Sequence, residues 1–384
     1  MTDNIKKAAI MIVLAACAVM YFGGPHLLRG QGQPQGNTPL SKWRPTHEQP
    51  GVRYVGSRTC AQCHTYQAEN FFSTPMAHAL ETASGCQILG KHPRLTFRQG
   101  SFSYQITRQN DRSVYSVSDG VNSISETILY CFGQGVAGQT YVFRHKGALY
   151  ESRVSYFQEL KGLDITILHP RAVPASLEDA LGRQMSAEGA KGCFSCHSTG
   201  AVSGSQLQLE RLAPGVSCEA CHGPGEKHLA AVRAENFKDL QIFNPGSLDP
   251  FDLTQEFCGS CHMSFEQAFA MPDHGGINNL RFQPYRIFNS RAHFLNDSRI
   301  SCTACHDPHD KLKHEASFYD SKCLACHLSD SKEARTEMRA AAACPVSTKQ
   351  CTSCHMPKVD VPEMHFKFTD HWIRIVKPQE PTPR

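Results

Sequence analysis

Apolar and polar residues alternate along the stretch 96–170. Phe102, Tyr104 and Ile106 stand two positions apart, and a second alternating run at 114–117 precedes an Asp-Gly turn. Two later apolar runs, at 141–143 and 149–150, flank a Lys-Gly pair. Because a period of two is typical of strands with one buried face, the pattern predicts a small antiparallel β-meander over 96–170.

Helical periodicity elsewhere is short and interrupted. The pattern predicts helical pieces at 59–72, 75–83, 177–187, 225–235, 255–269 and 332–343, with extended segments between them. Apart from the β-meander, the chain is therefore expected to be mostly coil with short α-helices.

The N-terminus has the pattern of an export signal. Lys6 and Lys7 precede an apolar run over 8–22, which ends at a Gly-Gly-Pro sequence. The length of this run is intermediate between that of a signal peptide and that of a membrane span. We predict that residues 1–24 are a signal peptide or an N-terminal membrane anchor. The rest of the chain is then exported, to the periplasm or the extracellular space.

One pattern, Cys-x-x-Cys-His, occurs seven times, and its copies are numbered here motifs 1 to 7 in chain order. Paired cysteines also form zinc sites and disulfides, but neither needs a histidine directly after the second cysteine in every copy. The pattern is the attachment signature of c-type haem. The paired cysteines are Cys60 and Cys63, Cys193 and Cys196, Cys218 and Cys221, Cys258 and Cys261, Cys302 and Cys305, Cys323 and Cys326, and Cys351 and Cys354.

The spacing within each motif fits this chemistry. Each thiol adds to one haem vinyl group, and three residues of separation place both sulfur atoms on one side of a helical turn. The histidine that follows then ligates the iron as its proximal ligand. We therefore predict seven covalent haem c groups, whose irons are ligated by His64, His197, His222, His262, His306, His327 and His355.

The haem motifs are too dense for separate protein pockets. Motifs 2 to 7 span residues 193–355, or about 27 residues per haem. The fold class predicted is a multihaem cytochrome c, with a stacked haem core inside short helices and coil. The segments are a Gly/Gln/Pro-rich linker at 25–51, a first haem region at 52–95, the haem-free β-meander at 96–170, a six-haem domain at 171–375 and a loose tail at 376–384.

The second axial ligand of each iron decides between an electron carrier and an enzyme. Methionines close to motifs (Met76, Met263 and Met356) are one source of ligands. Histidine is the default because thirteen histidines outside the motifs exceed the seven that are needed: His26, His47, His78, His92, His145, His169, His228, His274, His293, His309, His314, His365 and His371.

Three cysteines of the exported part lie outside the motifs. A disulfide between Cys86 and Cys131 would leave Cys344 as a single thiol. A structural role is favoured over a catalytic one, and the sequence leaves the pairing open.

The formal charge of +4 does not indicate nucleic-acid binding. Each haem adds two propionates, so seven haems would make the holoprotein acidic. The arginines and lysines are expected to pair with these propionates.

In sequence context, the motifs resemble the doubled-CXXCH multihaem c-type cytochromes, which are related to the tetrahaem electron carrier of ammonia oxidisers and to octahaem reductases. The resembling segments are 54–79, 182–197, 215–228, 284–293, 302–309 and 365–371. The resemblance implies distal-ligand roles for His78, His92, His228, His293, His309, His365 and His371, with His145, His169, His274 and His314 in reserve. The reductases of this group replace one proximal histidine by lysine or cross-link a tyrosine to the active-site haem, whereas all seven motifs here end in histidine.

The favoured function is therefore electron transfer by an exported heptahaem cytochrome with bis-histidine haems, and an enzymatic role is less favoured. One alternative is a multihaem oxidoreductase that converts a small nitrogen or sulfur compound at one five-coordinate haem. Another is a subunit of an extracellular cytochrome filament. The partners expected are a redox donor and a redox acceptor, and no nucleic acid.

Overall fold

A computed structural model describes residues 43–46, 53–271, 279–290, 300–327, 344 and 346–376. The chain divides into two compact units, Met1–Asn37 and Thr38–Arg384, and the described residues belong to the second. The predicted N-terminal segment, most of the linker, the helix at 332–343 and nearly all of the tail lie outside the described residues. Within the described ranges, no helix is both long enough and apolar enough to span a membrane.

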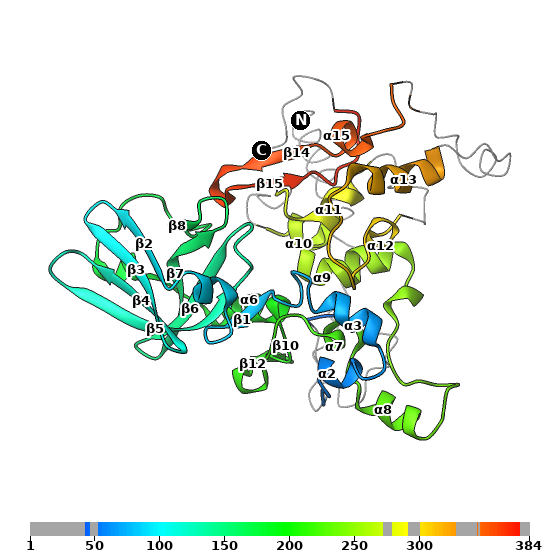
Figure 1. The fold of residues 1–384 in the computed structure, drawn as a ribbon, viewed down its shortest axis with the longest axis horizontal. Helices are drawn as coiled ribbons and strands as arrows, with labels where there is room; N and C mark the ends of the chain where they lie inside the picture. Colours follow the sequence, from blue (N-terminus) through cyan, green and yellow to red (C-terminus); the bar gives the residue numbers. More distant parts are fainter. Residues whose placement is uncertain are drawn as a thin grey trace, which may run out of the picture. The chain divides into compact units, whose positions relative to one another are not determined.

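A large antiparallel sheet forms from residues between Leu80 and Gln184 (Figure 1). Seven strands are paired in chain order from β2 to β8, β1 pairs with β5, and β9 pairs with β7. The strands are β1 (Leu80–Thr82), β2 (Arg94–Gln99), β3 (Phe102–Gln109), β4 (Arg112–Ser118), β5 (Ser123–Phe132), β6 (Gln139–His145), β7 (Ala148–Phe157), β8 (Gly162–Ile165) and β9 (Gly182–Gln184).

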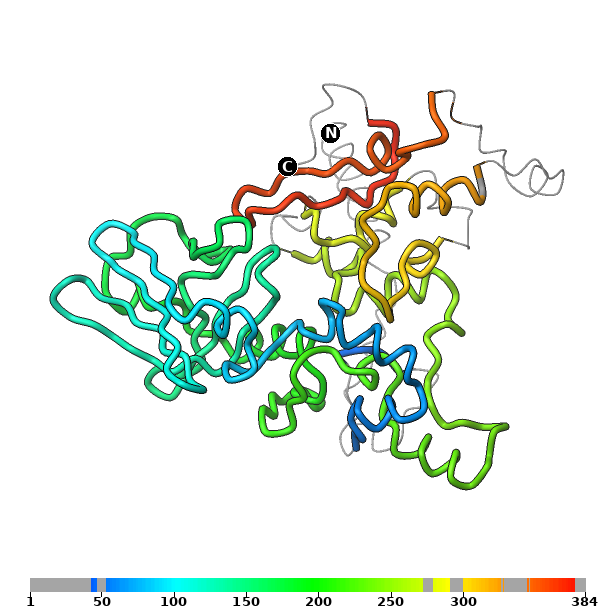
Figure 2. The backbone as a smooth tube through the Cα atoms, in the orientation of Figure 1, coloured from blue at the N-terminus to red at the C-terminus, as the bar shows by residue number. Residues whose placement is uncertain are grey.

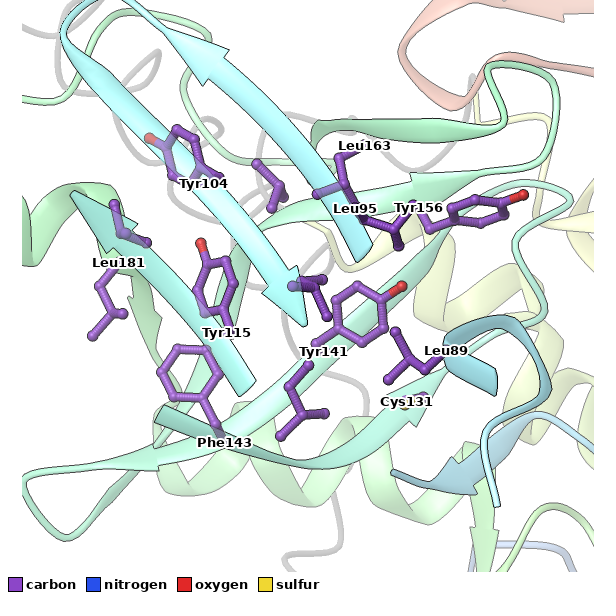
Figure 3. Packing of buried hydrophobic residues seen from close by; sticks show 14 of the residues in the cluster. Leu89, Leu95, Tyr104, Tyr115, Cys131, Tyr141, Phe143, Tyr156, Leu163 and Leu181 are labelled. Atoms are coloured by element: carbon purple, nitrogen blue, oxygen red, sulfur yellow. The ribbon is translucent and has the colours of Figure 1, made fainter. Parts of the chain in front are cut away.

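The sheet curls until its two edge strands, β2 and β8, contact each other, so that it is nearly closed. The alternation seen in the sequence explains its interior, because Phe102, Tyr104 and Ile106 of β3 are all buried. They pack with Tyr115 and Phe143 from β4 and β6 in one apolar cluster (Figure 3). Full burial of such an apolar side chain contributes about 1.5–3 kcal/mol. This cluster therefore makes the sheet a folded body with its own core.

The predicted fold class is wrong in its proportions. The chain is not mostly coil around haems with a small β insertion, because the large sheet has its own hydrophobic core. The local pattern gave the hairpins, but β1 and β9 join the sheet through long-range pairing with β5 and β7, which no local period indicates. The helical turn predicted at 75–83 is confirmed as a turn only at 75–78, since β1 follows it.

Short helices carry the motifs: motif 1 precedes the sheet, and motifs 2 to 7 follow it (Figure 2). They include α2 (Ser57–Cys60), α3 (Thr65–Phe71), α6 (Ala187–His197), α7 (Cys218–His222), α8 (Glu226–Arg233), the π-helical η4 (Asp252–Cys258), α9 (Gly259–His262), α10 (Phe265–Phe269), α11 (Gln283–Phe288), α12 (Cys302–Cys305), α13 (Ala316–His327) and α15 (Cys351–His355). A hairpin of β14 (Lys358–Val361) and β15 (Phe366–Thr369) follows motif 7.

The predicted helices at 59–72 and 225–235 correspond to α2, α3 and α8, so helix is confirmed in both stretches. The helix predicted at 177–187 is interrupted, because the chain forms α5 (Leu177–Leu181) and then β9 before α6 begins. The stretch 255–269 is divided among η4, α9 and α10.

Candidate haem site

The histidines of all seven motifs line a single cavity of about 3990 Å³. Pockets that hold one drug-sized ligand have volumes of roughly 300–1,000 Å³, so this cavity has room for several large groups. Most motif cysteines also line it: Cys60, Cys63, Cys196, Cys218, Cys221, Cys258, Cys261, Cys302, Cys305, Cys323 and Cys351. The sequence-predicted attachment residues are thus brought together around one continuous space.

The proximal histidines of motifs 2, 3 and 7 present the same nitrogen to the cavity. The Nδ1–H groups of His197, His222 and His355 donate to the backbone carbonyls of Ala79, Phe243 and Arg374, at 3.0, 3.0 and 3.1 Å. A carbonyl only accepts, so the proton lies on Nδ1 and the lone pair on Nε2. A backbone partner on one ring nitrogen is the usual arrangement of a metal-ligating histidine.

Three further histidines that line the cavity face motif histidines across it. The ring centroids of His64 and His228 are 6.4 Å apart, those of His222 and His309 are 6.0 Å apart, and those of His306 and His371 are 6.3 Å apart. The interplanar angles are 29°, 14° and 43°, in the same order.

These separations match two imidazoles on opposite sides of one metal ion. An imidazole nitrogen lies about 2.0 Å from a first-row metal, and the ring centre lies about 1.2 Å behind that nitrogen. Two such ligands in line therefore have ring centres about 6.4 Å apart. The residues present thus fit a haem iron at motifs 1, 3 and 5.

The facing histidines are oriented in the same way as the proximal ones. His228 Nδ1 donates to the Leu240 carbonyl at 2.7 Å, and His371 Nδ1 donates to the Thr369 carbonyl at 3.0 Å. His309 Nδ1 lies 3.4 Å from Asp307 Oδ1. In each case Nε2 is the nitrogen left for a metal.

Burial keeps several of these imidazoles neutral. Desolvation lowers the pKa of His197, His222, His262 and His306, and it lowers the pKa of His371 to about 4. A histidine must be neutral to donate its lone pair to a metal. Burial therefore favours the form of the ring that ligates iron.

Other predicted distal histidines do not line the cavity. His78 has both ring nitrogens against oxygen acceptors, Phe72 O at 2.8 Å and Glu81 Oε1 at 3.2 Å. His92 Nε2 lies 3.1 Å from the Tyr156 hydroxyl. The structure thus brings His228, His309 and His371 to the cavity but places His78 and His92 outside its lining.

His365, in the turn of the β14–β15 hairpin, also lies outside the cavity lining, and its Nε2 is 2.8 Å from Asp164 Oδ2 of β8. Among the reserves, His145 is held between Glu126 and Glu178 at 2.7 and 3.0 Å, and His169 contacts Glu151 at 3.2 Å. His314 lines the cavity, whereas His293 and His274 lie outside the described residues.

The motif helices contact one another in a connected series. Helix α2 contacts α7, which joins motifs 1 and 3. Helix α12 contacts η4, which joins motifs 5 and 4, and α6 contacts α9, which joins motifs 2 and 4. Helix α13 contacts both α12 and α15, which joins motifs 5, 6 and 7.

Motifs 3 and 4 supply the remaining link in this series. Cys221 and Cys258 both pack against the apolar cluster of Trp43, Phe243, Leu253 and Phe257, so motifs 3 and 4 are neighbours. The order of contact is therefore 1, 3, 4, 5, 6, 7, with motif 2 attached to motif 4. Groups bound at neighbouring motifs would lie close together.

A buried carboxylate inside motif 3 ties three parts of the site together. Glu219 accepts the backbone N–H groups of Val55, Gly56 and Gly225 at 2.9, 2.8 and 2.8 Å. The first two residues lead into α2, which carries Cys60, and the third precedes α8, which carries His228. Asp320 has a similar role, because it accepts the N–H groups of Gln350 and Cys351 at 2.7 and 2.8 Å.

Sequence reasoning missed both carboxylates. The one signal for Glu219 is its position between the two cysteines of a motif, where burial forces a carboxylate to find donors. No local signal marks Asp320, because it precedes motif 6 whereas its partners, Gln350 and Cys351, lie at the start of motif 7.

Residues 168–223, which include motifs 2 and 3, match the family model described as "Cytochrome c554 and c-prime". A comparison with curated proteins finds no match. Among solved structures, the chain is similar to one described as "Crystal Structure of Outer Cell Wall Cytochrome OcwA", with 21% sequence identity and a TM-score of 0.31. That similarity covers 54% of this chain and 37% of the other protein.

The family match and the repeated motif support a multihaem c-type cytochrome with covalently attached haem c and a role in electron transfer.

Proposed function

We propose that the chain is an exported heptahaem cytochrome that carries electrons between redox partner proteins. The observation that carries this proposal is the set of three histidine pairs at the spacing of a doubly ligated iron. When bound, each haem supplies an iron that accepts and releases one electron. We also propose that the chain is related to the doubled-CXXCH multihaem cytochromes.

The pairs assign distal ligands to three motifs. His228 serves motif 1, His309 serves motif 3 and His371 serves motif 5. In all three cases the distal histidine comes from a segment that follows a different motif. Such crossed ligation would tie the segments to one another.

Saturated irons favour a carrier over an enzyme. An iron held by two imidazoles has no free position for a substrate, so its role is limited to electron exchange. The contact series 1, 3, 4, 5, 6, 7 supports this role, because neighbouring motif helices would hold neighbouring haems within short distances. Motif 2 would form a branch at motif 4.

Three measurements on the mature protein, purified from a host that attaches haem c, test the proposal. Intact mass should show seven covalently added haems. The ferric electron paramagnetic resonance spectrum should contain low-spin signals, and carbon monoxide should bind to less than one haem per chain. A smaller haem count, or a full equivalent of high-spin iron that binds carbon monoxide, would contradict the proposal.

A further inference from the structure

Two cysteines that take no part in haem attachment lie together in the core of the sheet. Cys86 precedes α4 (Gln87–Lys91), Cys131 lies in β5, and their side chains are 2% and 0% exposed. Both belong to the cluster in which Leu89 and Tyr141 pack, shown in Figure 3. Both are free thiols, and each shifts the pKa of the other, as neighbouring thiols do.

A short series of hydrogen bonds leads from these thiols to a proximal histidine. The Cys86 thiol donates to Gln139 Oε1 at 3.2 Å, and Gln139 Nε2 donates to the Gly133 carbonyl at 2.8 Å. The Gly133 N–H donates to the Ala79 carbonyl at 2.8 Å. The same carbonyl accepts His197 Nδ1–H of motif 2 at 3.0 Å.

The loop at 133–138 packs closely against α4. A Cβ atom added at Gly135 would lie 2.8 Å from Ile88 Cδ1 of α4 and 2.9 Å from Tyr156, so backbone and helix are in close contact there. Gly133, Val136 and Gly138 of this loop also line the haem cavity. A displacement of α4 at Cys86 is therefore transmitted to the cavity wall beside motif 2.

We propose that Cys86 and Cys131 interconvert between a dithiol and a disulfide, and that this change alters the hydrogen bonding of His197 and the reduction potential of the haem at motif 2. The second part rests on the function proposed above. Hydrogen bonds to the proximal ligand are one of the features by which a protein sets haem potential.

The redox step is a thiol–disulfide exchange. Both S–H bonds break and one Sγ–Sγ bond forms, and two protons and two electrons pass to an exported protein disulfide, which becomes a dithiol. The Cys86 sulfur then has no hydrogen to donate to Gln139. The amide loses a fixed partner and with it the orientation that holds Gly133.

The local chemistry suits this exchange. The hydrogen bond from Cys131 lowers the pKa of Cys86, and it outweighs the opposite effect of burial. Thiolate is the attacking species in exchange. Since both sulfur atoms are buried, exchange requires the segment around α4 to open locally.

The experiment compares the wild-type haem-loaded protein before and after treatment with diamide. The oxidised form should be lighter by two hydrogen masses and should lose two alkylatable thiols. Protein-film voltammetry should then show that one midpoint potential shifts while the others stay unchanged. A Gln139→Leu variant, whose thiols are intact, should shift the same potential.

Cys344→Ser is the matched control, because Cys344 is exposed and outside the motifs. It should leave both the mass difference and the potentials unchanged. If diamide produces no loss of two hydrogens, the switch is overturned. If the disulfide forms and every potential holds, the coupling to His197 is overturned. A protein that lacks seven haems fails the mass test of the proposed function instead, so the two failures are distinguishable.

Discussion

The rings of His222 and His309 lie 6.0 Å apart with their planes inclined by only 14°. The first belongs to motif 3, whereas the second follows motif 5 and stands three positions after His306. Their separation is close to that of two axial ligands of one iron, about 6.4 Å. On the proposed function, a distal ligand would then come from a segment whose own motif binds a different haem.

Replacing His309 by alanine should therefore open one iron. We expect about one of seven haems to become high-spin in the ferric state, and the ferrous protein to bind about one carbon monoxide per chain. Electron paramagnetic resonance and carbon monoxide titration measure the two effects. His145→Gln is the control, because His145 lies on β6 between Glu126 and Glu178 and does not line the cavity. Seven low-spin irons in His309→Ala would refute the assignment.

Replacing Glu219 by alanine should destabilise the region around motifs 1 and 3. Three backbone N–H groups lose their acceptor, and a buried donor left without a partner costs about 1–3 kcal/mol. We expect the free energy of unfolding to fall by about 3 kcal/mol or more. Denaturant titration of the haem-loaded protein measures the change.

Glu210→Ala, at an exposed position on η2 (Leu209–Arg211), is the comparison for this variant and should change stability by less than about 0.5 kcal/mol. Equal effects of the two substitutions would show that Glu219 does not hold the segments together.

Arg286 and Asp370 form a buried ion pair that positions a predicted ligand. Arg286 Nη2 lies 2.8 Å from both carboxylate oxygens of Asp370. His371 directly follows Asp370 in the chain. Removing one partner of a buried pair costs about 3–5 kcal/mol, because the other charge is left uncompensated. Because Arg374 Nη1 also lies 2.7 Å from Asp370 Oδ2, Arg286→Met should lose less stability than this. It should also weaken low-spin ligation at motif 5, and denaturant titration and electron paramagnetic resonance separate the two effects.

The double variant Arg286→Met with Asp370→Asn removes both charges. It should recover only part of the lost stability, because Arg374, whose Nη1 lies 2.7 Å from Asp370 Oδ2, loses its partner. If the stability lost by the double variant relative to wild type equals the sum of the losses of the two single variants, the pair is not a coupled unit.

The sequence identified the motif residues but not the pairing of the ligands. Cys-x-x-Cys-His is a local pattern whose chemistry is complete within five residues, so motif histidines such as His222 are found without knowledge of the fold. The distal ligand is set by tertiary structure, as the distance along the chain between His64 and His228 shows. His365 illustrates the limit, because the family resemblance implied a ligand role for it, whereas its Nε2 lies 2.8 Å from Asp164 Oδ2.

The sheet shows the same division between local and long-range information. Alternation predicted the hairpins of β3 to β7 because each strand pairs with its neighbour in the chain. The size of the sheet was underestimated because β9 pairs with β7 across an intervening segment, and the curl that brings β2 to β8 depends on packing in the interior. Neither effect leaves a local pattern.

Acid should destabilise the sheet through Glu151. Burial alone would raise the pKa of this carboxyl, but His169 at 3.2 Å and Arg183 at 2.6 Å outweigh burial and hold the pKa below its usual value. A carboxyl whose pKa is lower in the folded state stabilises the fold above its unfolded pKa, about 4.3. That stabilisation is lost as the pH falls from this value through the folded pKa.

Glu151→Gln should therefore be less stable than wild type at neutral pH and should approach it below about pH 4, as measured by denaturant titration across this range. Glu159→Gln, at an exposed position, is the control and should follow wild type at every pH. A constant difference between Glu151→Gln and wild type over the whole range would contradict the expected role of the Glu151 charge.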